Sequence, residues 1–348
     1  MRGIVFLGNR KLELREFPDP TPGPGEVVIQ IKASGMCGSD LKFYRAAGNE
    51  AAALGLGGTG DPVIAGHEPC GVIAAVGPGV LDTEARAGQR VMNHHYKGCG
   101  QCKHCRQGWS QLCRKGIVVF GVTGDGAHAP YMKVPARTNV PLPEELSFEE
   151  GAAVSCGTGT AYGALKRLDV SGRDTLAVFG QGPVGLSATM LGSAMGARVI
   201  AVDITDERLA LAKELGAEAV VNSKDADPVA AIKQLTHGEG AETTMDCTGI
   251  AEARLAAVKS AATWGRVAFV GEGGATTFDI SADLIRKQLT LVASWTFSAI
   301  GQWECARFIA DRKIPLKRLL TERFTLDQAE DAYRLFDTQT TGKGVFVF

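Results

Sequence analysis

The sequence predicts an α/β protein in which a β-rich domain is joined to a doubly wound parallel sheet. Its 348 residues suit roughly two domains of about 150 residues each. Residues 1–153 contain short β-branched runs between prolines and glycines, which is typical of strands. From Thr175 onward, short apolar strands alternate with helical patterns, and this alternation indicates a parallel sheet with helices on both faces.

The β-rich domain is expected to include the last segment of the chain, residues 299–348. Within its first part, residues 27–33 and residues 71–77 are predicted strands, each flanked by prolines or glycines. A closing strand at residues 344–348 needs a sheet to join, and the sheet of this domain is the natural host. Between the early strands, the Ala- and Gly-rich residues 48–61 are expected to form a mobile loop with one short helical piece.

The second domain is expected over residues 154–298. Its strands are predicted at residues 175–179, 198–203, 219–221, 243–246, 267–270 and 289–292. Helices are predicted at residues 185–195 and 206–215, and Gly216 stands where the second helix should end. Together these elements predict one parallel sheet that is covered by helices on both faces.

Composition excludes several classes of function. Lys and Arg number 37 against 38 Asp and Glu, a net charge of −1, which gives no electrostatic footprint for binding nucleic acid or a membrane surface. No apolar run approaches the roughly 18 residues that a membrane helix requires, and the N-terminus lacks the pattern of a signal peptide. We therefore expect a cytoplasmic protein with no nucleic-acid or membrane partner.

Nine cysteines in such a chain indicate metal binding rather than a disulfide framework. Four of them form a C-x2-C-x2-C-x7-C pattern: Cys99, Cys102, Cys105 and Cys113. This spacing predicts a closed tetrahedral zinc site in a lobe at about residues 94–116. A redox cluster or an iron–sulfur centre is the alternative, although the fourth cysteine comes later than in the ferredoxin pattern. We expect the adjacent His94 and His95 to mark a strand end or an interface, because four cysteines already saturate zinc.

A glycine-rich loop leaves a predicted strand and opens a predicted helix: Gly180, Gln181, Gly182, Pro183, Val184 and Gly185. In this setting G-x-G-x-x-G is the fingerprint of a dinucleotide site. Gly180 should make the tight turn, Gly182 should let the backbone approach the pyrophosphate, and Gly185 should let helix and strand pack closely. A packing turn without a ligand is the alternative.

The residue that ends the next strand, Asp203, should accept hydrogen bonds from the adenosine ribose hydroxyls. A carboxylate at this position would repel a 2′-phosphate and therefore favours NAD over NADP. Arg208 lies one helical turn further on and could instead reach a phosphate, so it leaves the NADP alternative open.

Cys37, His67 and Cys156 each stand in a glycine-flanked motif. Taken singly, each has an ordinary explanation, since a cysteine is often a small buried residue and a lone histidine is usually structural. Sequence spacing alone cannot bring them together. If they meet in the fold, they offer two thiolates and one imidazole, a known composition for a catalytic zinc with an open fourth position.

In combination these motifs resemble those of the zinc-dependent medium-chain alcohol and polyol dehydrogenases. The motifs in order are GMCGSD, GHE, the four-cysteine lobe, SCGTGTAY, GQGPVG and a distal Asp203, and the match runs over essentially the whole chain. The resemblance implies a GroES-like catalytic domain, one catalytic and one structural zinc per chain, and NAD as the cofactor. It also implies hydride transfer from a secondary alcohol or polyol to NAD.

The resemblance further implies roles for individual residues. It makes three of them the ligands of the catalytic zinc: Cys37, His67 and Cys156. Glu68 matches the carboxylate beside the zinc, Ser39 the hydroxyl that relays the alcohol proton, and Asp40 the acid that orients the ligand histidine. Two positions depart from the pattern. Cys156 stands where many sorbitol-like members have a glutamate, and Lys42 stands where a histidine is frequent, which leaves the proton route beyond Ser39 open.

Further cofactor contacts are expected near the ends of the later strands, where a doubly wound sheet binds its ligand. These residues are Thr248, Val270, Gly271, Glu272, Ser294, Trp295 and Thr296. For Trp295 a place in the core is an equally good reading. We expect a homotetramer, with a dimer as the second choice, because the last strands of this sheet should lie at an edge that can pair across a two-fold axis.

The activity has three alternatives. An L-threonine 3-dehydrogenase of the same superfamily would need charged partners for an amino acid, and the sequence does not locate them. A zinc-free quinone reductase is disfavoured by the set of Cys37, His67 and Cys156. A non-enzymatic protein that binds NAD or zinc would differ from the enzyme in metal content, since the enzyme should hold two zinc ions per chain.

Overall fold

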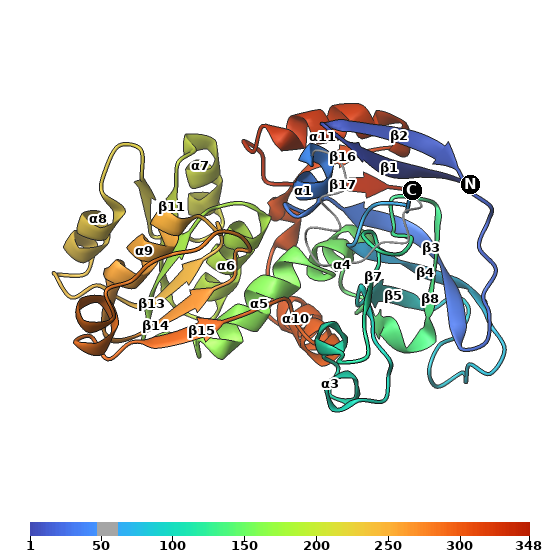
Figure 1. The fold of residues 1–348 in the computed structure, drawn as a ribbon, viewed down its shortest axis with the longest axis horizontal. Helices are drawn as coiled ribbons and strands as arrows, with labels where there is room; N and C mark the ends of the chain where they lie inside the picture. The colour runs from blue at the N-terminus through green and yellow to red at the C-terminus, as the bar shows by residue number, and fades with distance from the viewer. Residues whose placement is uncertain (47–61) are drawn as a thin grey trace. The chain divides into compact units, whose positions relative to one another are not determined.

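The computed structural model describes residues 1–46 and 62–348, so the predicted loop at residues 48–61 lies outside the described residues. The chain divides into two units (Figure 1). Unit 1 comprises Met1–Gly159 and Phe297–Phe348, and unit 2 comprises Thr160–Thr296. The expected domain boundaries lay after residues 153 and 298, so the chain leaves unit 1 slightly later than expected and Cys156 belongs to unit 1.

Unit 1 is built on a seven-stranded sheet in the order β16-β17-β3-β4-β5-β9, with β8 also paired to β3. The strands are β3 Glu26–Gly35, β4 Pro69–Val76, β5 Arg90–Asn93, β8 Tyr131–Pro135, β9 Asn139–Pro141, β16 Leu320–Phe324 and β17 Lys343–Val347. The C-terminal strand β17 pairs with β3 in antiparallel fashion, which confirms that the chain's end returns to this sheet. Strand β16, parallel to β17, was not predicted, because only Leu320 and Phe324 of its five residues are apolar.

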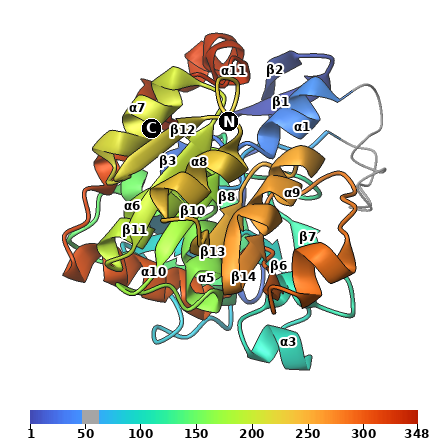
Figure 2. The ribbon, with the colours of Figure 1, turned by 90° about the vertical axis from the view of Figure 1, so that its left-hand side faces the viewer.

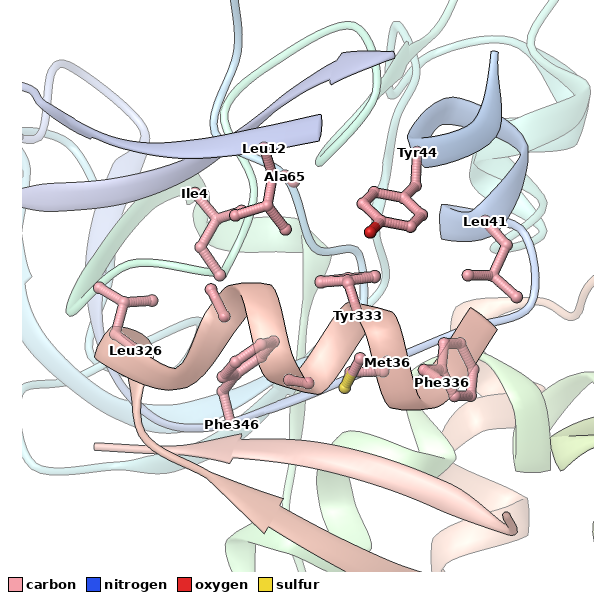
Figure 3. Close-up of a cluster of buried hydrophobic side chains, with 12 residues drawn as sticks. Ile4, Leu12, Met36, Leu41, Tyr44, Ala65, Leu326, Tyr333, Phe336 and Phe346 are labelled. Carbon is pink, nitrogen blue, oxygen red and sulfur yellow. The ribbon is translucent and has the colours of Figure 1, made fainter. Parts of the chain in front are cut away.

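A hydrophobic cluster forms where helix α11, Ala329–Asp337, packs against the first strands of the chain (Figure 3). Strands β1, Arg2–Gly8, and β2, Lys11–Glu16, form a hairpin that contributes apolar side chains to this cluster. The other helices of unit 1 are α1 Asp40–Arg45, α4 Phe148–Val154 and α10 Ala299–Asp311, with short turns of 3-10 helix η2 Ala136–Thr138, η4 Leu316–Leu319 and η5 Leu326–Gln328. Helices α10 and α11 both belong to the C-terminal segment of the chain.

The four-cysteine lobe has little regular structure. It contains the two-residue strands β6, Tyr96–Lys97, and β7, Val118–Val119, the short helix α3, Lys103–Arg106, and the 3-10 turn η1, Ser110–Leu112. Such a segment has too few apolar side chains for a core of its own, so a metal is the expected source of its stability.

Unit 2 holds a six-stranded parallel sheet in the order β12-β11-β10-β13-β14-β15. The strands are β10 Thr175–Phe179, β11 Arg198–Asp203, β12 Ala219–Asn222, β13 Ala241–Asp246, β14 Ala261–Phe269 and β15 Thr290–Ala293. In order of sequence this arrangement is 3-2-1-4-5-6, the doubly wound order whose direction reverses between β10 and β13. The prediction of one parallel sheet is therefore confirmed, and only β14 begins notably earlier than expected.

Helices cover both faces of this sheet (Figures 1 and 2). Helix α6 packs beside α7, and α8 packs beside α9. The helices are α5 Gly157–Arg167, which crosses the boundary between units, α6 Pro183–Ala194, α7 Asp206–Glu214, α8 Pro228–Leu235 and α9 Ala251–Ser260, with a π-helical turn η3 at Ile280–Ile285. Gly216 has a φ of +109° beyond the end of α7 and terminates it as predicted. Among the described residues, no helix is long and apolar enough to cross a membrane.

Candidate functional site

Four side chains of unit 1 that can bind a metal meet near the C-terminal end of β3: Cys37, His67, Glu68 and Cys156. Cys37 follows β3, His67 and Glu68 precede β4, and Cys156 precedes α5. Their potential ligand atoms all lie within 4.8 Å of one another, and all four residues are buried. The fold thus brings together the residues that sequence spacing could not unite.

The distances within this cluster fit zinc. The Sγ atoms of Cys37 and Cys156 are 3.8 Å apart. Tetrahedral zinc with Zn–S bonds of about 2.3 Å places two sulfur ligands about 3.8 Å from each other. Because the Cys156 thiol donates a hydrogen bond to Cys37, the pKa of Cys37 lies well below its ordinary value, while that of Cys156 is raised. One thiolate is therefore already favoured at this site.

The imidazole of His67 is oriented by Asp40. The Asp40 carboxylate forms an ion pair with His67, with Oδ1 2.9 Å from Nδ1, and it accepts from the Cys37 backbone N–H at 2.8 Å. With Nδ1 engaged, Nε2 is the ligand atom left for a metal, and it lies 3.1 Å from the Ser39 hydroxyl. Burial lowers the pKa of His67, but the charges of Asp40 and Cys37 outweigh burial and raise it well above its usual value.

The carboxylate of Glu68 is held by residues that sequence reasoning did not single out. One oxygen accepts from the Gly157 backbone N–H at 3.2 Å, and the other forms an ion pair with Lys343 of β17. Both side chains are fully buried. Burial raises the pKa of Glu68, and the charge of Lys343 opposes this rise. A Cβ at Gly35 would lie 1.9 Å from Glu68 Oε2, so this approach requires glycine.

His95 is a second neighbour that the sequence interpretation left aside. It follows β5, as the expectation of a strand end had it, but its ring lies 5.1 Å from that of His67 between centroids. Its Nδ1 donates to the Ser155 carbonyl at 3.0 Å, and burial lowers its pKa well below the ordinary value. His94 is also buried and contacts the Phe297 carbonyl through Nε2 at 3.0 Å. The sequence feature that could have identified both residues is the adjacent pair of histidines directly after β5.

The cysteines of the lobe form a second cluster whose geometry fits a metal. All four Sγ atoms lie within 4.8 Å of one another, with pairs at 3.5, 3.9 and 4.0 Å. Backbone N–H groups, first that of Gln101, lower the pKa of Cys99, and the backbone N–H of Cys105 lowers that of Cys102 to about 6. A Cβ at Gly98 would lie 2.6 Å from the Cys105 sulfur, which explains a glycine at this point.

The G-x-G-x-x-G loop of unit 2 has the expected local geometry. Gly180 has a φ of +86° at the end of β10, and a Cβ at Gly185 would lie 1.7 Å from the Gly180 carbonyl oxygen. Gly182 is the N-cap of α6, which Pro183 and Val184 open, and it differs from the other two glycines. Its φ is −72°, and a Cβ there would meet none of the described residues within 4 Å. Packing within the protein therefore does not require glycine at position 182.

Asp203 and Arg208 lie beside this loop. The Asp203 carboxylate accepts from the backbone N–H groups of Gln181, Ile204 and Thr205, so it is fixed against the glycine loop. Burial lowers the pKa of Arg208 on α7, and the charge of Asp203 opposes that effect. Arg208 is thus buried within the electrostatic range of Asp203.

The remaining predicted cofactor residues follow the C-terminal ends of β13, β14 and β15, on the same side of the sheet as the glycine loop. The backbone hydrogen bonds between neighbouring strands extend into these loops: Val270 N–H donates to the Asp246 carbonyl at 3.0 Å, and Ser294 N–H donates to the Phe269 carbonyl at 3.0 Å. The residues concerned are Thr248 after β13, Val270, Gly271 and Glu272 after β14, and Ser294, Trp295 and Thr296 after β15. Trp295 is 37% exposed, which excludes the alternative of a core aromatic.

Asp246 at the end of β13 organises two of these loops. Its carboxylate accepts from the backbone N–H and the hydroxyl of Thr248. It also pairs with Arg254 at 3.3 Å, and Arg254 donates to the Gly271 carbonyl at 2.6 Å. These contacts were absent from the sequence interpretation, because they join residues of three separate elements.

Comparison with known proteins gives two matching family models. The model described as an alcohol dehydrogenase GroES-like domain matches residues 23–144. The model described as a zinc-binding dehydrogenase matches residues 183–311.

Similar proteins extend over nearly the whole chain. An uncharacterized zinc-type alcohol dehydrogenase-like protein of Escherichia coli K12, YphC, is 41% identical and covers 100% of this chain and 99% of its own. An alcohol dehydrogenase of Geobacillus stearothermophilus is 33% identical, with 98% of each chain covered. An L-threonine 3-dehydrogenase of Pyrococcus horikoshii is 32% identical over 96% of this chain and 94% of its own.

Solved structures share the fold. The alcohol dehydrogenase TADH from Thermus sp. ATN1 superposes with a TM-score of 0.89 at 28% identity, covering 100% of this chain and 99% of its own. A structure from Escherichia coli CFT073, described as a short chain alcohol dehydrogenase (rspB) complexed with the cofactor NADH, has a TM-score of 0.86 at 28% identity, with 100% and 99% covered.

Proposed function

Since the chain belongs to the zinc-dependent medium-chain alcohol and polyol dehydrogenases, we propose that it oxidises a secondary alcohol or polyol with NAD. Membership of this family makes the protein a zinc-type alcohol dehydrogenase-like oxidoreductase. The substrate class, the cofactor and the roles of individual residues are the parts that we propose.

The observation that carries the proposal is the buried set of Cys37, His67 and Cys156. Two sulfurs 3.8 Å apart and an imidazole whose Nε2 faces the same cluster are three of the four ligands that a catalytic zinc uses. Zinc bound there would supply a Lewis acid that stabilises negative charge on a substrate oxygen. The four cysteines of the lobe would hold the structural zinc, because four thiolates leave no open position.

In the proposed reaction, the residues around this set handle the proton and the geometry. Ser39, with its hydroxyl 3.1 Å from His67 Nε2, relays the proton that the alcohol loses, because its oxygen takes that proton while its own hydroxyl proton passes on. Asp40 keeps His67 in the tautomer that carries its proton on Nδ1. Lys343 fixes Glu68, the carboxylate beside the ligands. Lys42 lies half-buried on α1, close in sequence to Ser39, and is the candidate for the next step of proton release.

NAD is the proposed cofactor of unit 2. Neither backbone conformation nor packing explains Gly182, so we attribute it to a close approach of the pyrophosphate to the N-terminus of α6. Asp203 at the end of β11 favours a ribose without a 2′-phosphate. Because Arg208 is buried within range of Asp203, we assign it to that carboxylate rather than to a cofactor phosphate. The relative in complex with NADH supports the same choice.

Oxidation of L-threonine is the second candidate, and the relative named L-threonine 3-dehydrogenase favours it. An amino acid would need a cationic and an anionic partner near the cluster.

Two separate clusters of metal-ligand type argue against a binding protein without catalysis, since a purely structural metal would need only the lobe.

We further propose a homotetramer, with a dimer as the second choice. Strand β15 ends the sheet of unit 2, and Leu291 on it is 41% exposed. An exposed apolar edge strand is prone to pair with another strand. Light scattering at the mass of a single 36.6 kDa chain would contradict this assembly.

The direct test is an activity screen with NAD against secondary alcohols, polyols, sugars and L-threonine, combined with zinc analysis. We expect two zinc ions per chain and turnover of an alcohol or polyol. Turnover of threonine alone would select the second candidate. A chain that holds one zinc and reduces NAD with none of these substrates would contradict the proposal.

A further inference from the structure

A line of buried hydrogen bonds leads from Asp40, the ion-pair partner of His67, away from the metal-type cluster. Asp40, which holds His67 Nδ1, also accepts from the hydroxyl of Tyr333 at 3.3 Å. Tyr333 is joined to Nε2 of His128 at 2.7 Å, and Nδ1 of His128 is joined to the hydroxyl of Ser34 at 2.8 Å. Four contacts thus connect five side chains in series.

The chemistry of the groups fixes the direction of every bond in this series. An ionised carboxylate only accepts, so Tyr333 donates to Asp40. The tyrosine oxygen then accepts from His128 Nε2–H, which leaves Nδ1 of the same ring to accept from the Ser34 hydroxyl. Such a ring carries one proton. Burial lowers the pKa of His128 to about 4, which agrees with a neutral ring.

The series is held rigidly by the packing around it. Ser34, His128 and Tyr333 are fully buried and come from β3, the loop before β8, and α11. A Cβ at Gly66, whose φ is +91°, would lie 2.4 Å from His128 Nδ1, so the ring packs directly on the backbone before His67. Figure 3 shows Tyr333 on α11 within the apolar cluster. Neither ring can leave its place without disturbing this core.

We propose that Tyr333, His128 and Ser34 are positioning residues that set the metal affinity of His67 through Asp40. The inference depends on the proposed function, because it takes Cys37, His67 and Cys156 as the ligands of a catalytic zinc. The Cys37 backbone N–H and the Tyr333 hydroxyl both donate to Asp40 Oδ2, while Oδ1 receives His67. Two donors on one oxygen fix the plane of the carboxylate, and that plane aims His67 Nε2 at the cluster.

The perturbation that isolates this role is Tyr333→Phe, which removes one hydroxyl and keeps the ring. It takes one donor from Asp40 and removes the oxygen that accepts from His128 Nε2. Loss of a hydrogen-bond partner behind a metal ligand typically weakens metal binding about 10- to 100-fold. We expect about a tenfold increase in the dissociation constant of the catalytic zinc, with no change for the four-cysteine zinc.

Tyr44→Phe is the matched control. Tyr44 is buried in the same apolar cluster with its ring centroid 5.5 Å from that of Tyr333, but its hydroxyl has no place in the series. The same chemical change therefore probes the packing without the hydrogen bonds. His128→Gln, whose amide can still donate to Tyr333, should retain more zinc affinity than His128→Leu.

The measurement is release of zinc from the loaded protein to a chromogenic chelator at increasing concentration. The phase that is missing in Cys37→Ala belongs to the catalytic zinc. If Tyr333→Phe weakens only that phase and Tyr44→Phe leaves it unchanged, the positioning role holds. If both variants leave it unchanged, or both weaken the two phases alike, the inference is wrong while the proposed function stands. A wild-type chain with a single zinc phase would overturn the proposed function itself, and the inference with it.

Should Tyr333→Phe fail to fold, Ser34→Ala tests the same positioning role from the other end of the hydrogen-bonded series. It removes the donor to His128 Nδ1 and leaves both rings in place. A smaller but selective weakening of the catalytic zinc supports the series. A catalytic zinc phase equal to that of the wild-type protein overturns it.

Discussion

The ion pair between Lys343 and Glu68 allows a worked prediction of stability. Both side chains are fully buried, and Lys343 also donates to the Met36 carbonyl at 3.0 Å. In Lys343→Met the apolar replacement fills most of the space but leaves Glu68 without its counter-charge. Breaking a buried pair by removing one partner costs about 3–5 kcal/mol. We expect the free energy of unfolding to fall by that amount.

The assay is urea denaturation of the zinc-loaded protein at pH 7, with the double variant Glu68→Gln, Lys343→Met as the control. The double variant removes both charges and keeps an oxygen that can accept from Gly157 N–H. It should recover most of the lost stability, because replacing both partners of a buried pair is often nearly neutral. A loss below about 1 kcal/mol in Lys343→Met, or no recovery in the double variant, would refute the electrostatic explanation.

Three further predictions concern the lobe, the cofactor and pH. Cys102→Ser should lose one zinc and much thermal stability, since metal binding there is coupled to local folding, while turnover per folded molecule changes far less; loss of activity in fully folded protein would contradict a structural role. Asp203→Ala should relax discrimination against NADP in steady-state kinetics, and a wild-type protein that prefers NADP would contradict the assignment. Burial lowers the pKa of His94 to about 4, below its ordinary value of 6.5, so its contribution to stability is present above pH 6.5 and is lost as the pH falls toward 4. His94→Gln should therefore show a shallower acid loss of unfolding free energy, by up to about 1.4 kcal/mol per pH unit, and an unchanged slope would contradict the buried neutral state.

The features that could be predicted from the sequence are those encoded in neighbouring residues. The glycine loop with Asp203 and the six strands of unit 2 each carry a local pattern, and the structure places them as expected. The four cysteines lie within 15 residues, so a turn-rich segment can bring their sulfurs together. The meeting of Cys37, His67 and Cys156 came only from the family resemblance.

The residues that sequence reasoning missed act across long separations. Lys343 contacts Glu68 across 275 residues of sequence, and Tyr333 contacts Asp40 across 293 residues. A buried lysine in a terminal strand and a tyrosine in an amphipathic helix carry no local sign of such a partner. Their roles follow from β17 pairing with β3 and from α11 packing beside β1 and α1, which are properties of the whole fold.

The central claim is that Cys37, His67 and Cys156 hold the zinc at which an alcohol is oxidised. The most direct measurement is the zinc content, NAD affinity and turnover of purified, folded Cys37→Ala. We predict one zinc per chain instead of two, an unchanged dissociation constant for NAD, and a rate lower by at least about 10³-fold, because the Lewis acid supplies several kcal/mol of transition-state stabilisation. Full activity in a Cys37→Ala protein that has lost one zinc would contradict the claim.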